Sequence, residues 1–296
     1  KLDKPQVEPA DMEVPILTTT SEEPIFVLAR CTAISYGTYL LVLTNITRLK
    51  KLERIRQDFV ANVSHELKTP ITSILGFVET LKEGAIDSPE TAHKFLDILY
   101  QQSNRLSQIV TDLLTLSKLE QNQTLPEKIN LDVYNLCNSV VNQYTEEAMA
   151  KNDIIKIEIK ADNLQVTGNP VLLEQALGNL IANAIAYCPN NAEITIIISL
   201  VKENSNPKWV SIAVEDTGPG IPLEARQRIF ERFYRIDKGR SRDAGGTGLG
   251  LSIVRHIILI HGGKVLVEDK IDGTPGARFV FLLPVVKKTN IDTTIE

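Results

Sequence analysis

The sequence predicts a multidomain fold, in which an α-helical hairpin is followed by an α+β sandwich. Three observations predict it. Two long stretches in the first half carry apolar residues at helical spacing, the second half alternates strand-like and helix-like stretches irregularly, and a glycine-rich run there opens an apolar helix. At 296 residues, the chain has room for about two ordinary domains plus linkers.

Composition excludes several classes of function. The net charge of −5 predicts no nucleic-acid partner and no general affinity for anionic membranes. Cys31, Cys137 and Cys188 lie far apart without CxxC spacing, which argues against a zinc site or a disulfide framework and indicates a reducing compartment. No apolar run approaches the about 18 residues that span a bilayer, so we expect this chain itself to be soluble.

The N-terminal part contains a predicted hairpin. Residues 1–24 carry four prolines among acids and are expected to be a poorly ordered loop. Residues 25–33 and 38–44 are rich in β-branched and aromatic residues and predict two antiparallel strands. This stretch resembles the end of a PAS sensor domain that runs into a signalling helix. A hairpin cap without a sensing role is the alternative.

A helix is predicted from about Thr47 to Glu83. Its apolar stripe, from Ile55 to Val78, leaves His65 facing solvent. Glu66 follows directly, and a carboxylate can hold one ring N–H of a histidine while the other nitrogen stays nucleophilic. Pro70 should kink or loosen the helix. By itself, an exposed histidine on a helix is ordinary.

A second helix is predicted after Gly84, which suits a helix C-terminus, with Ser88 as its N-cap. Its apolar residues step by three and four from Ala92 to Leu116, which predicts coiled-coil-like packing. Because two helices bury little alone, we expect a homodimer that closes a four-helix bundle. An intramolecular seam is the alternative.

Residues 121–126 form a predicted linker, and a domain of mixed structure follows. The predicted helices cover residues 134–151, 171–186 and 248–261, and the predicted strands cover residues 154–160, 164–167, 193–201, 209–215, 264–268 and 278–282.

Several stretches of this second domain suit a nucleotide. Asp216 to Gly220 follows a strand, where glycines let the backbone approach a flat ligand. Residues 245–251 form a glycine-rich loop that opens a helix, where free N–H groups favour a polyphosphate, although the Walker ending is missing. Asn179 and Asn183 share a helix face and suit Mg²⁺. Taken singly, these stretches could be ordinary turns and helix polarity.

Together with the hexapeptide His65 to Pro70, these stretches resemble the H, N, G1, F and G2 boxes of sensor histidine kinases of two-component systems. The resemblance covers about residues 48–287 and favours the phosphate-sensing and cell-wall-sensing subgroup. It implies an ATP-binding sandwich of the GHKL ATPase type. The domains expected are a PAS-like end at 1–47, the phosphotransfer hairpin at 48–124, the catalytic domain at 125–288 and a tail at 289–296.

The resemblance implies roles for individual residues. His65 would be the phosphoacceptor, Glu66 the base that orients it, and Thr69 a residue for dephosphorylating the partner. Asn179 and Asn183 would bind Mg²⁺. ATP would be bound by these two asparagines and by Tyr187, Asp216, Gly218, Gly220, Ile221, Phe230, Phe233, Arg235, Gly246, Thr247, Gly248, Leu249 and Gly250.

The implied activity is autophosphorylation of His65 by ATP, followed by transfer to an aspartate of a response regulator receiver domain. The full-length protein is expected to be membrane-anchored through an N-terminal part missing here, with this chain cytoplasmic. Many relatives have a basic residue where this chain has Ala186, so ATP turnover could be reduced, or Arg232, Arg235, Lys238 or Arg240 could supply the charge. The alternatives are an ATP-gated phosphatase or scaffold and a GHKL ATPase that phosphorylates no histidine.

Overall fold

The computed structural model describes residues 10–18, 21–35, 38–121, 127–161, 164–203, 206–237 and 246–286. The chain divides into two compact units, Lys1–Lys68 and Thr69–Glu296, and the long helix α1 (Thr47–Lys82) passes from the first into the second. Within the described segments, none of the helices combines the length and the apolar character needed to cross a membrane.

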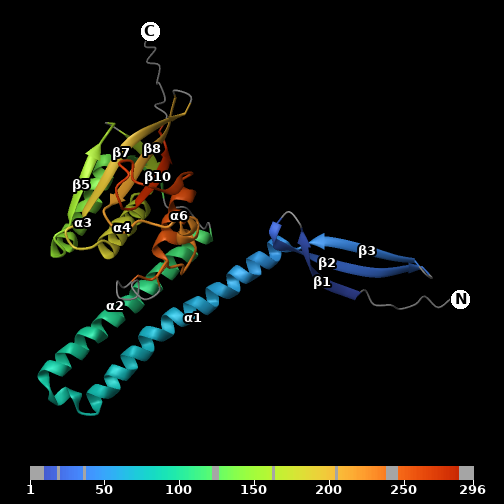
Figure 1. Ribbon diagram of the computed structural model, residues 1–296, viewed down its shortest axis with the longest axis horizontal. Helices are drawn as coiled ribbons and strands as arrows, with labels where there is room; N and C mark the ends of the chain where they lie inside the picture. The colour runs from blue at the N-terminus through green and yellow to red at the C-terminus, as the bar shows by residue number, and fades with distance from the viewer. Residues whose placement is uncertain are drawn as a thin grey trace, which may run out of the picture. The chain divides into compact units, whose positions relative to one another are not determined.

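The first unit contains a three-stranded antiparallel sheet in the order β1-β2-β3 (Figure 1). Strands β2 (Ser21–Ser35) and β3 (Thr38–Asn45) confirm the predicted hairpin. Strand β1 (Ala10–Thr18) corrects the expectation of a loop over residues 1–24, of which residues 1–9 lie outside the described part. Its apolar residues alternate with acids, and Pro15 is tolerated because β1 is an edge strand.

The predicted helical hairpin is confirmed, and most of it belongs to the second unit. Helix α1 ends at Lys82, the 3₁₀ helix η1 (Ala85–Asp87) forms the turn, and α2 runs over Pro89–Glu120. Gly84 has a φ of 121°, which confirms the need for glycine after α1. The rings of Phe77 and Phe95 lie 5.0 Å apart and join the two helices. The chain stays helical through Pro70, so the expected loosening does not interrupt α1.

A mixed five-stranded sheet follows in the order β5-β7-β8-β10-β9. Strand β5 (Ile154–Ile159) is parallel to β7 (Glu193–Glu203), and the other pairs are antiparallel: β8 (Asn206–Asp216), β9 (Lys264–Glu268) and β10 (Arg278–Pro284). Helices α3 (Val133–Ala150), α4 (Pro170–Tyr187) and α6 (Gly250–Ile260) pack beside one another and against this sheet (Figure 1). The expected α+β sandwich is confirmed.

Three further elements were not expected from the sequence. Strand β4 (Ile129–Asp132) pairs with β6 (Gln165–Gly168) in a separate ladder. After β8, the chain forms the 3₁₀ helices η2 (Leu223–Ala225) and η3 (Arg228–Phe230). The elements β4, η2 and η3 have only three or four residues each, and their residues show no periodic pattern.

The core of the sandwich lies between the sheet and its helices. Ile196 of β7 pairs with Val214 of β8, and Ile212 pairs with Phe281 of β10, so that alternate residues of neighbouring strands share one face. All four are buried, and burial of each such side chain stabilises the fold by about 1.5–3 kcal/mol. This core fixes the end of β8 and the start of α6, where the candidate site residues lie.

Candidate functional site

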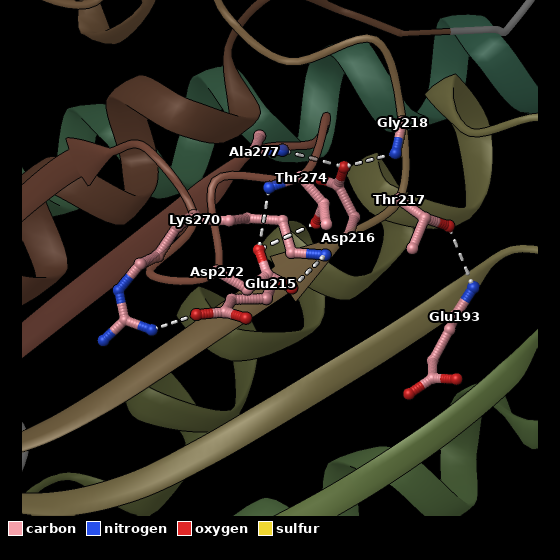
Figure 2. A network of polar contacts seen from close by, with 10 residues as sticks. Glu193, Glu215, Asp216, Thr217, Gly218, Lys270, Asp272, Thr274 and Ala277 are labelled. Carbon is pink, nitrogen blue, oxygen red and sulfur yellow. Dashed lines mark hydrogen bonds and ion pairs between the residues drawn. The ribbon is translucent and has the colours of Figure 1, made fainter.

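Asp216, the last residue of β8, is held by the backbone of two loops (Figure 2). Its Oδ1 atom accepts a hydrogen bond from the Gly218 amide at 2.8 Å and another from the Ala277 amide at 3.0 Å. The side chain is 8% exposed. A buried carboxylate with two fixed donors keeps one orientation, so Asp216 can present a defined acceptor to a ligand.

Gly218 leaves room for this arrangement. A Cβ atom there would lie 2.9 Å from Oδ1 of Asp216 and 2.9 Å from Sγ of Cys188. Only glycine lets the chain pass so close to both groups. The role of Ala277 was not predicted, although Gly273 and Gly276 just before it mark a tight loop that returns to Asp216.

Cys188, at the C-terminal end of α4, lies beside the Asp216 carboxylate. Burial, together with this negative charge, raises the pKa of the Cys188 thiol to about 12. Nearby, the Lys151 ammonium group donates hydrogen bonds to the carbonyl oxygens of Ile185 and, at 2.9 Å, of Cys188. A cation therefore lies close to the end of α4 that carries Ala186, and it comes from Lys151, the residue that follows α3.

The glycine-rich loop, α4 and residues 231–237 after η3, the lid segment, meet at the N-terminus of α6. The Asn179 side chain donates through Nδ2 to the carbonyl oxygen of Gly250 at 3.3 Å. The Phe233 amide donates to the carbonyl oxygen of Gly248 at 2.8 Å, and the Arg235 guanidinium donates to the carbonyl oxygen of Gly246. Three separately predicted motifs are thus joined by hydrogen bonds.

Gly248 is required at its position in this cluster. Its φ is 73°, and an added Cβ would lie 2.9 Å from Cα of Phe233. Phe233 itself has a φ of 62°, which is uncommon for an aromatic residue. The backbones of the lid segment and the glycine-rich loop are therefore in close contact, and this contact fixes the shape of the loop.

Thr247 of the same loop contacts the helical hairpin. Its hydroxyl donates to Oδ2 of Asp112 on α2 at 2.7 Å, and its Oγ1 accepts from the Leu249 amide at 3.2 Å. Burial raises the pKa of the Asp112 carboxyl group, and hydrogen bonds from Thr247 and Gln108 partly oppose this shift. Asp112 was not among the predicted site residues, because its spacing on α2 is that of an ordinary stripe residue.

The remaining predicted residues lie as follows. Asn183 and Tyr187 lie half-buried further along α4, Phe230 is buried in η3, and the Ile221 carbonyl oxygen accepts from Nε of Arg226 at 3.2 Å. Lys238, Arg240 and Gly245 lie outside the described residues.

The phosphotransfer motif is on α1. His65 and Thr69 are exposed there, and Glu66 is half-buried. His65 and Glu66 belong to the first compact unit and Thr69 to the second.

The donor set suits ATP and Mg²⁺. The N-terminus of α6, an 11-residue helix, and the preceding loop favour a polyphosphate, and Asp216 can accept from the amino group of a flat base. Asn179 uses Nδ2 for Gly250, so Oδ1 is its atom that can bind a metal. Among the described residues no three His, Cys, Asp or Glu side chains form a metal cluster. Mg²⁺ that is bound to phosphates needs only a few ligands from the protein.

Comparison with known proteins agrees with this geometry. Residues 55–122 match the family described as "His Kinase A (phospho-acceptor) domain". Residues 168–287 match the family described as "Histidine kinase-, DNA gyrase B-, and HSP90-like ATPase". The first match includes His65, and the second includes every predicted nucleotide-binding residue.

Individual relatives are similar over most of the chain. The sensor-like histidine kinase SenX3 of Mycobacterium tuberculosis is 41% identical over 239 residues, which are 80% of this chain and 55% of that protein. The sensor protein kinase WalK of Staphylococcus epidermidis is 35% identical over 244 residues, which are 82% of this chain and 39% of that protein. The chain therefore spans about half, or less, of the length of these relatives.

The solved structure of histidine kinase ThkA in complex with response regulator protein TrrA is also similar. The TM-score is 0.63, with 27% identity, and the match covers 94% of this chain and 79% of that chain.

Proposed function

The chain belongs to the sensor histidine kinases of two-component systems, and from this membership we propose that it transfers the γ-phosphoryl group of ATP to His65. The observation that carries the proposal is the hydrogen-bonded cluster at the N-terminus of α6, where Asn179, Phe233 and the glycine-rich loop meet. Because such a helix start offers unpaired N–H groups and a positive dipole end, it suits the triphosphate.

Asp216 would select the base. Its fixed carboxylate would accept a hydrogen bond from the adenine amino group, while Gly218 and Gly220 let the backbone lie against the ring. Tyr187, Ile221, Phe230 and Leu249 would line the site. Asn179 and Asn183 would hold Mg²⁺ through their amide oxygens. When bound, Mg²⁺ would neutralise charge on the group in transfer.

Arg235 would supply the cation that Ala186 does not. Its guanidinium already donates to the Gly246 carbonyl oxygen, so it lies at the glycine-rich loop. Lys151 would not take this role, because its ammonium group donates hydrogen bonds to two carbonyl oxygens at the end of α4. The charge lost at position 186 would therefore be replaced from the lid segment.

His65 would attack through Nε2. The imidazole is exposed, as a nucleophile that meets a separate domain must be. Glu66 would accept the hydrogen bond from Nδ1–H, which keeps Nε2 unprotonated. As the Nε2–phosphorus bond forms, the bond from phosphorus to the β,γ-bridging oxygen breaks, ADP leaves, and Glu66 takes the Nδ1 proton.

The hairpin would form a homodimer. Leu96, Tyr100, Val110 and Leu114 of α2 and Ile71, Leu75 and Val78 of α1 are between 39% and 70% exposed. These residues recur at helical spacing on each helix, so each helix carries an apolar stripe that a second copy would bury in a four-helix bundle.

The next acceptor would be an aspartate on a response regulator receiver domain. The similar protein ThkA was solved in complex with a response regulator, which supports this partner class. Thr69, exposed one turn after His65, would orient the water that removes the phosphoryl group from the regulator. Membrane anchorage of the longer protein stays a prediction.

Labelled ATP tests the proposal. The chain is incubated with γ-labelled ATP and Mg²⁺ beside the His65→Gln and Asp216→Asn variants. We expect label that is acid-labile and alkali-stable in the wild type and missing from both variants. ATP binding without label would favour the phosphatase or scaffold alternative. ATP hydrolysis that persists in His65→Gln, again without label, would favour a GHKL ATPase of another kind.

A further inference from the structure

The C-terminal half of α2 presents one side to the nucleotide-binding domain. Ile109, Asp112 and Leu116 are the buried residues of this helix, and their spacing of three and four places them on one face. Helix α2 contacts α6 within the same compact unit. A buried carboxylate therefore stands between two apolar side chains in this contact.

Each oxygen of the Asp112 carboxyl group accepts a hydrogen bond there. Asp112 is 4% exposed, with Gln108 donating to Oδ1 at 2.8 Å and Thr247 donating to Oδ2 at 2.7 Å. A threonine hydroxyl has a single proton, so Thr247 cannot donate to Asp112 and to a phosphate oxygen at once. The Leu249 amide is used as well, because it donates to Oγ1 of the same threonine.

The position of this contact matters as much as its hydrogen bonds. Thr247 and Leu249 directly precede α6, where the dipole and the unpaired N–H groups favour a negative charge. Through its hydrogen bond with Thr247, the Asp112 carboxyl group lies at the loop that precedes this helix end. A polyphosphate at the same loop would find the Thr247 hydroxyl already donated to Asp112. Its negative charge would also lie close to the acidic side chain of Asp112.

A second acidic residue of α2 contacts the lid segment. Glu120, the last residue of the helix, forms an ion pair with Arg232, and its Oε1 lies 3.7 Å from Nε2 of His256 on α6. Arg232 follows η3, and Phe233 after it is bonded to the loop at Gly248. Helix α2 thus holds the glycine-rich loop and the lid segment at the same time.

We propose that Asp112 competes with the polyphosphate for Thr247, so that docking of α2 on the glycine-rich loop and binding of nucleotide oppose each other. The inference rests on the proposed function, in which this loop binds ATP. Asp112 is then a positioning residue that the phosphotransfer hairpin contributes to the nucleotide site. By linkage, nucleotide must weaken the α2 contact by the same factor by which the contact weakens nucleotide binding.

Binding of a non-hydrolysable ATP analogue with Mg²⁺ tests the proposal. Calorimetry on the whole chain compares the wild type with Asp112→Leu and Asp112→Asn. Leucine is apolar like the neighbouring Ile109 and Leu116, and it cannot accept a hydrogen bond from Thr247. We therefore expect the Kd of the analogue to be about tenfold lower in Asp112→Leu, which corresponds to about 1.4 kcal/mol. Asparagine keeps a neutral acceptor, and we expect a smaller gain in the same direction. Asp97→Asn, an exposed acid on the same helix, should leave the Kd unchanged.

The measured Kd values distinguish failure of the competition from failure of ATP binding itself. An unchanged or higher Kd in the Asp112 variants would overturn the competition while leaving ATP binding intact. Failure of every variant, including the wild type, to bind the analogue would overturn the proposed function and this inference with it.

Hydrogen exchange gives a second test that needs no variant. In the wild type, the analogue should speed exchange of the backbone amides around residues 109–116, because α2 is released from the loop. Slower or unchanged exchange there, at saturating analogue, would contradict the competition.

Discussion

One oxygen of the Asp216 carboxylate accepts both backbone hydrogen bonds. The structural role of this side chain can therefore be tested separately from its proposed role in binding ATP. The Asp216→Asn variant keeps an oxygen for both amides, so we expect its melting temperature to stay close to that of the wild type. The new NH₂ group replaces an acceptor with a donor. ATP affinity should therefore fall about tenfold or more, measured by calorimetry. Asp272→Asn, in the neighbouring loop of Figure 2, is the matched control and should bind ATP normally.

Gly248 offers a test of the loop geometry. With a φ of 73° and a Cβ position 2.9 Å from Cα of Phe233, Gly248→Ala should destabilise the chain by about 1–2 kcal/mol. It should also weaken nucleotide binding, because the loop must move away from the lid. Gly76→Ala is the control: nothing lies within 4 Å of its added Cβ, and alanine inside α1 should stabilise by up to about 1 kcal/mol. Urea unfolding of both variants decides, and equal stability would contradict the strain.

Cysteine reactivity tests the electrostatics around Asp216. Burial raises the pKa of Cys188 and of Cys137 to about 12, whereas Cys31 is only partly buried. At pH 8.5 almost none of the two buried thiols is ionised, so iodoacetamide should modify Cys31 alone. The unfolded thiols lose their protons near pH 9. Stability from these two groups is therefore complete below about pH 9 and is lost as the pH rises towards 12. Rapid alkylation of Cys188 in the folded chain would contradict this environment.

Among the elements, α2 carries two faces with different partners. Ile109 and Leu116 are buried within the chain, while Val110 and Leu114 are 44% and 58% exposed. We expect Leu114→Asp to convert a dimer into a monomer in analytical ultracentrifugation, because burial of each leucine contributes about 1.5–3 kcal/mol. Leu223→Asp changes a leucine in η2, outside the hairpin, that is 74% exposed, and this variant should remain dimeric. A Leu114→Asp variant that sediments with the same mass as the wild-type dimer would argue against a dimer interface on this face of α2.

Most helices and strands were predicted close to their observed positions, including the short strands β6 and β9. Helices α1 and α2 and strands β7 and β8 begin and end close to the predicted residues. Strand β1 was missed because the prolines and acids of residues 1–24 suggest a loop. Its stability comes from pairing with β2, including the 2.6 Å ion pair of Asp11 with Arg30. Partners of this kind cannot be deduced from local spacing.

At the scale of the whole molecule, the sequence predicts the motifs but not all of their contacts. The loop from Gly246 to Gly250 and the turn after Asp216 were predicted because glycines mark them. The contacts of Asp216 with Ala277 and of Thr247 with Asp112 join residues 61 and 135 positions apart. Neither Ala277 nor Asp112 is unusual in its local sequence, so only the folded chain shows these two hydrogen bonds.

Transfer of the phosphoryl group from ATP to His65 can be tested by mapping the phosphate on the chain. After incubation with ATP and Mg²⁺, the chain is digested with trypsin at alkaline pH, where phosphohistidine survives. The peptide Gln57–Lys68 is then fragmented in a mass spectrometer. We expect the phosphate on His65, with none on the adjacent Ser64. Phosphate on Ser64, or none on this peptide while ATP is bound, would contradict the histidine kinase function.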